Sequence, residues 1–205
     1  MSLFPMFVKL KGRRVVVVGG GEIAAGKLDA LLQAGAKVTV VSPAVNSQVS
    51  SLVKERKIEW REKEFAQKDL DGAFLVIAAT SVPSVNESVY RTADARGLLC
   101  NAVDDIENSH FYYGSVVQRG DLQIAISTNG KSPALAQRLR KELEAQFGPE
   151  YESWIEWLGA AREVLRASGA ASAQTKEVLH NLASSEGFER FLEESARKPS
   201  TEGVE

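Results

Sequence analysis

Cysteine and histidine are scarce in this sequence. It contains one cysteine, Cys100, and two histidines, His110 and His180. A single cysteine excludes a disulfide within the chain and any CxxC metal motif, and so few ligands argue against a permanent zinc site of histidine and cysteine. Cys100 lies in the apolar run GLLCNAV. We expect it to be a core residue, because free cysteine is among the most buried residue types.

An excess of one charge and long apolar runs are also missing. The 205 residues include 25 Lys and Arg against 27 Asp and Glu, so the overall field gives no reason to expect nucleic acid or a membrane surface as partner. No apolar run reaches membrane-spanning length. The N-terminus, MSLFPMFVKLKGRR, carries its charges after its apolar patch and does not resemble a signal peptide. We therefore expect a soluble protein of the cytoplasm.

Residues 13–105 show an alternation of strand and helix patterns. Apolar runs such as RVVVV, AFLVIAAT and GLLCNAV alternate with amphipathic segments such as EIAAGKLDALLQAGA. Continuous apolar runs are typical of strands covered on both faces. The sequence therefore predicts an α/β, Rossmann-like parallel-sheet domain over residues 1–112.

The pattern changes after about residue 113. Arg119-Gly120-Asp121 separates two short strand patterns and is read as a hairpin turn, and a helix follows with Ser132 as its cap and Pro133 in its first turn. This small α+β unit, residues 113–147, cannot close a core alone. It must pack on the first domain or pair with another copy, as a dimerisation unit would. We expect a helical region at 148–198 and a disordered tail at 199–205.

The segment VVVVGGGEIAAGK carries a glycine motif in the right context. Gly19, Gly21 and Ala24 follow the G-x-G-x-x-G/A spacing directly after a strand and at the start of a helix. Gly19 would allow a tight turn, Gly21 would let a pyrophosphate approach the backbone, and Ala24 would allow close helix packing. The pattern favours a dinucleotide site over a glycine turn without a ligand.

The end of the second strand departs from the usual dinucleotide pattern. The acidic residue that binds the adenosine ribose is expected there, but VTVVSPAV offers Ser42. No arginine stands beside Ser42 to hold a 2′-phosphate. The sequence therefore favours NAD over NADP.

Two adjacent carboxylates, Asp104 and Asp105, end the strand GLLCNAV. Open α/β sheets place ligands at this end of their strands, so one of them could accept a proton beside a nicotinamide ring. The alternative is a turn into IENS begun by either residue. His110 is read as a structural histidine.

The segment STNGKSP, residues 127–133, holds a second candidate. It is not a P-loop, because Ala125 stands where the first glycine would be. The loop, the helix N-terminus and the nearby cations, Lys131, Arg138, Arg140 and Lys141, could bind carboxylates. An ordinary solvated helix face explains the same residues equally well.

Taken together, several motifs carry a family resemblance. They are FPMFVKLKGRRVVVVGGGEIAAGK, VIAAT, CNAVDD and FYYGSVVQRGDLQIAISTNGKSPALAQRLRKELE. In this order, over residues 1–147, they resemble the precorrin-2 dehydrogenase and sirohydrochlorin ferrochelatase family of siroheme synthesis. The resemblance implies NAD-dependent oxidation of the tetrapyrrole precorrin-2, a homodimer and, in bifunctional members, insertion of Fe2+ as a substrate. We expect the methyltransferase domain of some members to be absent.

The resemblance also assigns residues. It places the catalytic aspartate at Asp104 and leaves Asp105 without that role. It places cofactor contacts in the glycine turn and after the second strand. Together with the residues already singled out there, the expected cofactor contacts are Gly19, Gly21, Glu22, Ile23, Ser42, Pro43, Ala44 and Thr80. The substrate loop that it implies is Ser127, Thr128, Asn129, Gly130, Lys131 and Ser132. Thr128 replaces a serine that some members carry and that can be phosphorylated there, so that modification is not assumed.

Two rival functions remain at this point. The first is a family member that only dehydrogenates and leaves metal insertion to another protein. The second is a regulatory Rossmann module that senses NAD and acts through its helical tail. The NAVDD and STNGKSP motifs count against the second rival.

Overall fold

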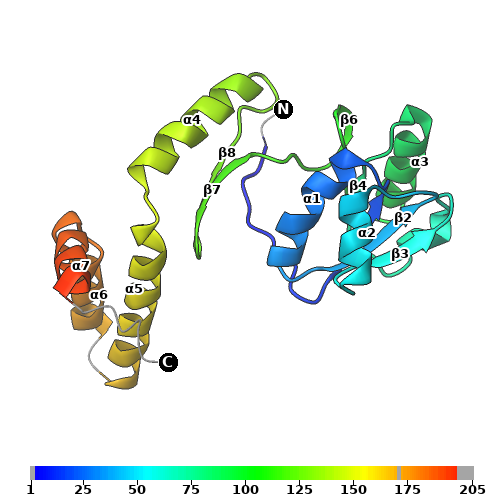
Figure 1. Ribbon diagram of the computed structural model, residues 1–205. Helices are drawn as coiled ribbons and strands as arrows, with labels where there is room; N and C mark the ends of the chain where they lie inside the picture. Colours follow the sequence, from blue (N-terminus) through cyan, green and yellow to red (C-terminus); the bar gives the residue numbers. More distant parts are fainter. Residues whose placement is uncertain (1–2, 170–171, 198–205) are drawn as a thin grey trace. The chain divides into compact units, whose positions relative to one another are not determined.

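The chain forms two compact units in the computed structural model, which describes residues 3–169 and 172–197 (Figure 1). The first unit spans residues 1–113 and the second spans residues 114–205. The expected disordered tail, residues 199–205, lies outside the described residues. No helix in the described ranges is long and apolar enough to cross a membrane.

The first unit is built on a six-stranded sheet with the order β3-β2-β1-β4-β5-β6. The strands are β1 (Arg14–Val18), β2 (Lys37–Ser42), β3 (Glu59–Glu62), β4 (Leu75–Ala78), β5 (Leu99–Ala102) and β6 (Asp105–Ser109). Strands β1 to β5 are mutually parallel, and the edge strand β6 is antiparallel to β5. The predicted Rossmann-like α/β fold is confirmed.

Helices cover both faces of this sheet. They are α1 (Glu22–Gln33), α2 (Ser47–Lys54), the short 3-10 helix η1 (Gln67–Leu70) and α3 (Pro83–Asp94). Buried residues of α1 and α2 belong to one core cluster with alternate residues of β1 and β2, and those of α3 and η1 belong to a second cluster on the other face. Gly35 and Gly97 follow α1 and α3 with φ of 73° and 65°, as expected of helix-ending glycines.

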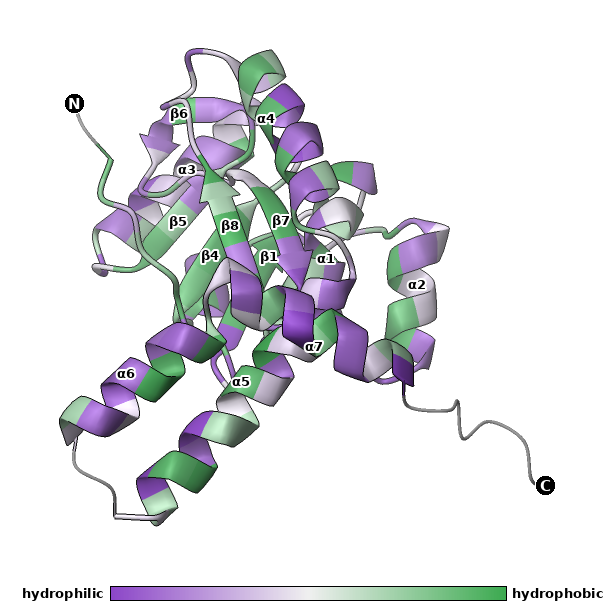
Figure 2. Cartoon of the chain, turned by 90° about the vertical axis from the view of Figure 1, so that its left-hand side faces the viewer, coloured by the Kyte–Doolittle hydropathy of each residue, from purple (hydrophilic) through white to green (hydrophobic). Residues whose placement is uncertain are grey.

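The run of valines in β1 follows from burial of this strand on both faces. Val15 and Val17 belong to the first core cluster, and Val16 and Val18 belong to the second. Successive side chains point to opposite faces of a strand, so a strand covered on both faces needs apolar residues at every position. Figure 2 shows the same hydrophobic colour along β4 and β5.

The second unit begins with a hairpin. Its elements are β7 (Ser115–Arg119), β8 (Leu122–Ile126), α4 (Pro133–Gln146), α5 (Glu150–Ala167), α6 (Ser172–Leu182) and α7 (Ser185–Arg197). Gly120 turns the hairpin with φ of 53°, and the Ser132 side chain caps α4 by accepting from the Leu135 N–H. Both features agree with the sequence prediction. Arg119 ties β7 to the end of α4, because its Nε donates to the Phe147 carbonyl at 2.9 Å.

The hydrophobic core of the second unit is small. Its buried hydrophobic residues in the described ranges are Val117, Ala136 and Trp154. Trp154 lies in an aromatic cluster with Tyr151 and Phe188, with ring centroids 4.6 to 5.5 Å apart. Helices α5 and α6 carry both hydrophobic and hydrophilic residues (Figure 2).

Cys100 lies in the core of the first unit, as predicted. It is fully buried on β5, and burial raises the pKa of its thiol to about 12. Because the thiolate is the reactive form, we expect iodoacetamide to leave Cys100 unmodified at pH 8 in the folded protein and to alkylate it once urea unfolds the chain. Mass spectrometry of the two samples checks this. Rapid alkylation of the folded protein would contradict the buried position.

Candidate functional site

A cavity of about 780 Å³ lies at the carboxyl ends of β1, β2 and β4. Its lining includes all eight residues for which a cofactor role was predicted: Gly19, Gly21, Glu22, Ile23, Ser42, Pro43, Ala44 and Thr80. The lining also includes residues that sequence reasoning missed, namely Gly20, Asn46, Glu64, Phe65, Ser81, Val82, Ser84, Val85 and Ser88. The structure therefore brings the predicted residues together at the sheet edge where open α/β folds bind ligands.

Gly19 and Gly20 make the turn after β1 possible. Gly19 has φ of 119°, and a Cβ there would lie 2.3 Å from the Ala79 carbonyl oxygen. A Cβ on Gly20 would lie 2.4 Å from the Ala44 carbonyl oxygen. The turn is thus squeezed between the chain segments that follow β4 and β2, and only glycine fits at either position. The sequence motif identified Gly19 but not Gly20, which occupies a variable position of that motif.

Gly21 differs from both. It is the N-cap of α1, its φ of −85° is open to any residue, and a Cβ there would meet nothing within 4 Å. Neither the backbone nor the packing of the protein requires glycine. Gly21 lines the cavity at the start of α1, and a helix N-terminus attracts phosphate. The geometry therefore fits a pyrophosphate that approaches the backbone at Gly21.

Ser42 ends β2 at the wall of the cavity. It is 9 % exposed, and its hydroxyl donates a hydrogen bond of 2.7 Å to the Ala44 carbonyl oxygen. The indole of Trp60 on β3 donates to the Ser42 carbonyl at 3.0 Å. Since the hydroxyl proton is engaged, Ser42 can offer a ligand its oxygen lone pairs only. The bend over residues 42–44 is fixed by these two bonds.

Thr80 is fixed at the opposite wall by Asn86 of α3. Its hydroxyl donates a hydrogen bond of 2.7 Å to the Asn86 Oδ1, and the Thr80 N–H donates to the same oxygen at 3.0 Å. In return, the Asn86 Nδ2 donates a hydrogen bond to the Thr80 carbonyl oxygen. Asn86 is 8 % exposed. A buried side-chain amide that satisfies three groups of one residue holds the loop after β4 in a single conformation. Nothing in the sequence marked Asn86, which stands inside an ordinary helix pattern.

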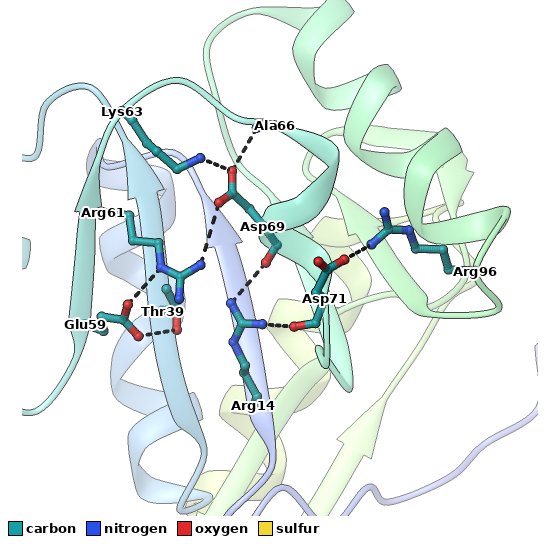
Figure 3. Close-up of polar contacts among 9 residues, drawn as sticks. All are labelled: Arg14, Thr39, Glu59, Arg61, Lys63, Ala66, Asp69, Asp71 and Arg96. Carbon is teal, nitrogen blue, oxygen red and sulfur yellow. Dashed lines mark hydrogen bonds and ion pairs between the residues drawn. The ribbon is translucent and has the colours of Figure 1, made fainter.

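A buried carboxylate fixes the segment 63–66, which contributes Glu64 and Phe65 to the cavity. Figure 3 shows the Asp69 carboxylate between the cations of Arg61 and Lys63. Its distance to the Lys63 Nζ is 2.5 Å, and it accepts the Ala66 N–H at 2.8 Å. Both ends of the segment are therefore attached to one side chain that is 1 % exposed.

The charge of Asp69 is stabilised in this position. Burial by itself would raise the pKa of its carboxyl, but the hydrogen bonds from Lys63 and the Ala66 N–H outweigh burial and hold the pKa below its ordinary value. Arg14 of β1 donates to the backbone carbonyls of Asp69 and Asp71, so the same turn is also attached to the centre of the sheet (Figure 3).

Asp104 follows β5, one strand along the same sheet edge from Thr80. The Val103 N–H donates a hydrogen bond of 2.9 Å to the Ala78 carbonyl oxygen at the end of β4. This bond fixes the start of the turn. Asp104 itself is exposed, has φ of 61°, and is not among the residues that line the cavity. Aspartate tolerates this left-handed conformation better than most residues. The predicted position at the carboxyl end of a parallel strand is confirmed, and a catalytic role stays a prediction.

Asp105 serves the turn. Its carboxylate accepts the Asn108 N–H at 3.1 Å and the Asn108 side-chain amide at 2.6 Å. The Asn108 side chain, with the Asn108 N–H, holds the pKa of Asp105 below its ordinary value. The turn into IENS contains Asp104, one of the two residues from which it was expected, and IENS itself forms most of β6, which pairs with β5. The two aspartates marked the turn in the sequence, but nothing there showed that the chain returns as an antiparallel strand.

His110 is held by the backbone and by α3. Its Nδ1 accepts the Cys100 N–H at 3.1 Å, so the Nε2 of the neutral ring carries the proton and donates it to Asp94 at 3.0 Å. The ring also lies 4.9 Å from that of Tyr90. These contacts agree with the structural role expected from the sequence.

The loop Ser127–Ser132 lies in the second unit, before α4. The Thr128 hydroxyl oxygen accepts the Ser132 N–H at 3.1 Å, and the Lys131 N–H bonds the Thr128 carbonyl. Of the cations that could attract carboxylates, Arg138 and Arg140 form ion pairs with glutamates one turn along α4. Lys131 and Lys141 form none in the described ranges. Substrate binding by this loop stays a prediction.

Resident metal chemistry has no support in these ranges. Within residues 3–169 and 172–197, no group of three or more His, Cys, Asp or Glu side chains could hold a metal ion. The expectation that the chain has no permanent metal site stays a prediction for the whole chain.

Comparisons with known proteins add two family matches. A family model described as "Putative NAD(P)-binding" matches residues 6–115, and one described as "Sirohaem biosynthesis protein central" matches residues 119–146. The first covers the Rossmann-like unit with its cavity. The second begins at the last residue of β7 and covers β8, the loop before α4 and the whole of α4.

Several curated proteins are similar over most of the chain. A siroheme synthase of Actinobacillus pleuropneumoniae is 37% identical over 193 residues, which are 94% of this chain and 40% of that protein. A siroheme synthase of Photorhabdus laumondii is 45% identical over 163 residues, which are 80% of this chain and 35% of that protein. The chain therefore spans about two fifths of the length of these curated relatives.

A solved structure is similar to this chain over nearly the whole length of this chain. It is described as SirC, precorrin-2 dehydrogenase, and matches with a TM-score of 0.79 and 27% sequence identity. The match covers 96% of this chain and 100% of that chain. The likeness thus includes both units, not only the nucleotide-binding fold that many proteins share.

Proposed function

Since the chain belongs to the siroheme-synthesis family of NAD(P)-binding proteins, we propose that it is an NAD-dependent dehydrogenase that converts precorrin-2 into sirohydrochlorin. One observation carries the proposal. A dinucleotide-sized cavity with an open phosphate position at Gly21 lies one strand away from an exposed carboxylate, Asp104, at the same edge of the sheet.

Different residues of the cavity are proposed to bind different parts of the cofactor. The first N–H groups of α1 receive the pyrophosphate at Gly21, Glu22 and Ile23. Residues Ser42–Ala44 line the adenosine side, because they end β2. Thr80, fixed by Asn86, lines the side toward β5, where the nicotinamide end belongs.

Asp104 is the residue proposed to take the proton. Bound NAD supplies a hydride acceptor. Dehydrogenation also releases a proton from the substrate, and an exposed carboxylate on the turn after β5 is suited to receive it. The Val103 N–H to Ala78 carbonyl bond ties the backbone of that turn to the end of β4, two residues before Thr80.

The second unit is proposed to bind the tetrapyrrole and to dimerise. The acetate and propionate groups of the substrate need local cations, and two candidates without an ion pair in the described ranges are Lys131 in the loop Ser127–Ser132 and Lys141 farther along α4. The unit buries few hydrophobic side chains of its own in the described ranges, and packing against a second copy would bury more of them. This homodimer and a cytoplasmic location stay predictions.

Iron insertion is the finer part of the proposal. We infer that Fe2+, as a substrate, enters sirohydrochlorin at the same site, with Asp104 accepting pyrrole N–H protons. The rival is a member that dehydrogenates only. The resemblance to a protein described as a precorrin-2 dehydrogenase supports the first step alone.

One experiment tests both steps. Purified protein is incubated with precorrin-2 and NAD without oxygen, absorbance is followed, and Fe2+ is then added. We expect sirohydrochlorin to form only when NAD is present, and Fe2+ insertion to run faster than in a control without protein. Oxidation without faster insertion selects the dehydrogenase-only rival. Binding of NAD without any oxidation would overturn the enzyme and favour the regulatory module.

A further inference from the structure

The charged residues that line the cavity are both acidic. Among the described residues of its lining, Glu22 and Glu64 are the only ones with a charged side chain, and no lysine or arginine is present. Glu22 begins α1, on the pyrophosphate side. Glu64 belongs to the segment after β3, on the far side of β2. An NADP 2′-phosphate would find no cation in this lining.

Glu64 lies where the adenosine ribose is expected. In dinucleotide folds the ribose is bound at the end of the second strand, which here is Ser42. Strand β3 is paired in parallel with β2, and Ser42 stands opposite Glu62. Glu64 follows two residues later and lines the cavity together with Ser42. The carboxylate that the end of β2 lacks is therefore available from Glu64, in the segment that follows β3.

The cations beside Glu64 in the sequence are engaged elsewhere. Lys63 holds Asp69 at 2.5 Å, and the Arg61 Nε donates to Glu59 at 2.8 Å (Figure 3). Neither residue lines the cavity. Glu64 itself is exposed and forms no ion pair in the described part of the chain. Its charge is thus not neutralised by its neighbours.

We propose that Glu64 sets the preference of this protein for NAD over NADP. Its carboxylate accepts a hydrogen bond from the ribose 2′-hydroxyl and repels a 2′-phosphate in the same place. Asp69 is the positioning residue, because it holds both ends of the segment 63–66 and keeps Lys63 away from the cavity. The assignment rests on the proposed function, since it requires a nicotinamide dinucleotide in this cavity.

Calorimetric titration with NAD and with NADP tests the assignment. We expect the wild-type protein to bind NAD at least about 10-fold more tightly than NADP, and Glu64→Gln to reduce that ratio by about 10-fold, as loss of one close charge predicts. Glu64→Asp, which keeps the charge, should retain a preference for NAD. The effect should shrink at 1 M salt, because the Debye length is then about 3 Å.

The matched control is Glu62→Gln. Glu62 is exposed, stands two residues earlier, and does not line the cavity, so the same change of charge there should leave the ratio of the two affinities unchanged. An unchanged ratio in Glu64→Gln, or an equal change in Glu62→Gln, would overturn the role of Glu64 and leave the dehydrogenase standing. A wild-type protein that binds neither dinucleotide would overturn both.

Discussion

Asp104→Asn is expected to lower turnover of precorrin-2 by about 100-fold to 10,000-fold, the usual contribution of a positioned general base. Asparagine removes the proton acceptor but keeps the size of the side chain. It also tolerates the left-handed conformation that φ of 61° requires. The turn between β5 and β6 should therefore persist, with the same melting temperature and the same affinity for NAD. Turnover, calorimetry and thermal melting measure the three properties separately.

The choice of asparagine matters because Asp104 has two explanations. A residue that serves only the turn would be replaced by asparagine with little effect on turnover, whereas alanine would strain the turn and confuse the two roles. Asp105→Asn is the control, since Asp105 accepts two hydrogen bonds from Asn108. It should change thermal stability more than turnover. Near-normal turnover of Asp104→Asn would place the base elsewhere.

Gly19→Ala and Gly21→Ala, although only two residues apart, are expected to have opposite effects. At Gly19 the new Cβ would meet the Ala79 carbonyl oxygen at 2.3 Å in a backbone with φ of 119°, which should cost about 3 kcal/mol of stability. Thermal melting should show a fall of about 6–12 °C. At Gly21 the Cβ meets no protein atom, so the melting temperature should hold while NAD affinity falls by about 10-fold or more, because the methyl group occupies the pyrophosphate approach.

Gly26→Ala supplies the control for both. Gly26 is an exposed position inside α1 with nothing within 4 Å of a new Cβ. Alanine there should stabilise the helix by about 0.5–1 kcal/mol and leave NAD affinity unchanged. If Gly21→Ala binds NAD as well as the wild-type protein, the phosphate does not lie at the start of α1 and the arrangement proposed for the cavity is wrong.

The sequence predicted the local features well because they depend on neighbours along the chain. The alternation of Val15 to Val18 is a property of one strand, the turn at Gly19 is a property of one dihedral angle, and the cap at Ser132 is a property of one helix end. Each is decided by steric contacts and hydrogen bonds within a few residues. The residues expected to contact the cofactor could be assigned to the ends of β1, β2 and β4 for the same reason, and their role in binding stays a prediction.

Other parts of the site depend on contacts between distant segments. Asn86 bonds Thr80 across a loop, Gly20 is required by Ala44, and the segment with Glu64 is fixed by Asp69. None of these residues breaks a local pattern, so nothing marked them in the sequence. The reversal at Asp104 likewise depends on pairing with β5.

The sequence by itself thus determined that the chain holds a parallel sheet, a glycine turn at the start of a helix and an aspartate after the fifth strand. The tertiary structure alone decided which side chains meet in the cavity. Strand order and register place β3 beside β2 and Glu62 opposite Ser42, so a carboxylate from the segment after β3 comes to lie where the end of β2 has none. Hydrogen bonding between strands sets that register, and the pattern within one strand does not contain it.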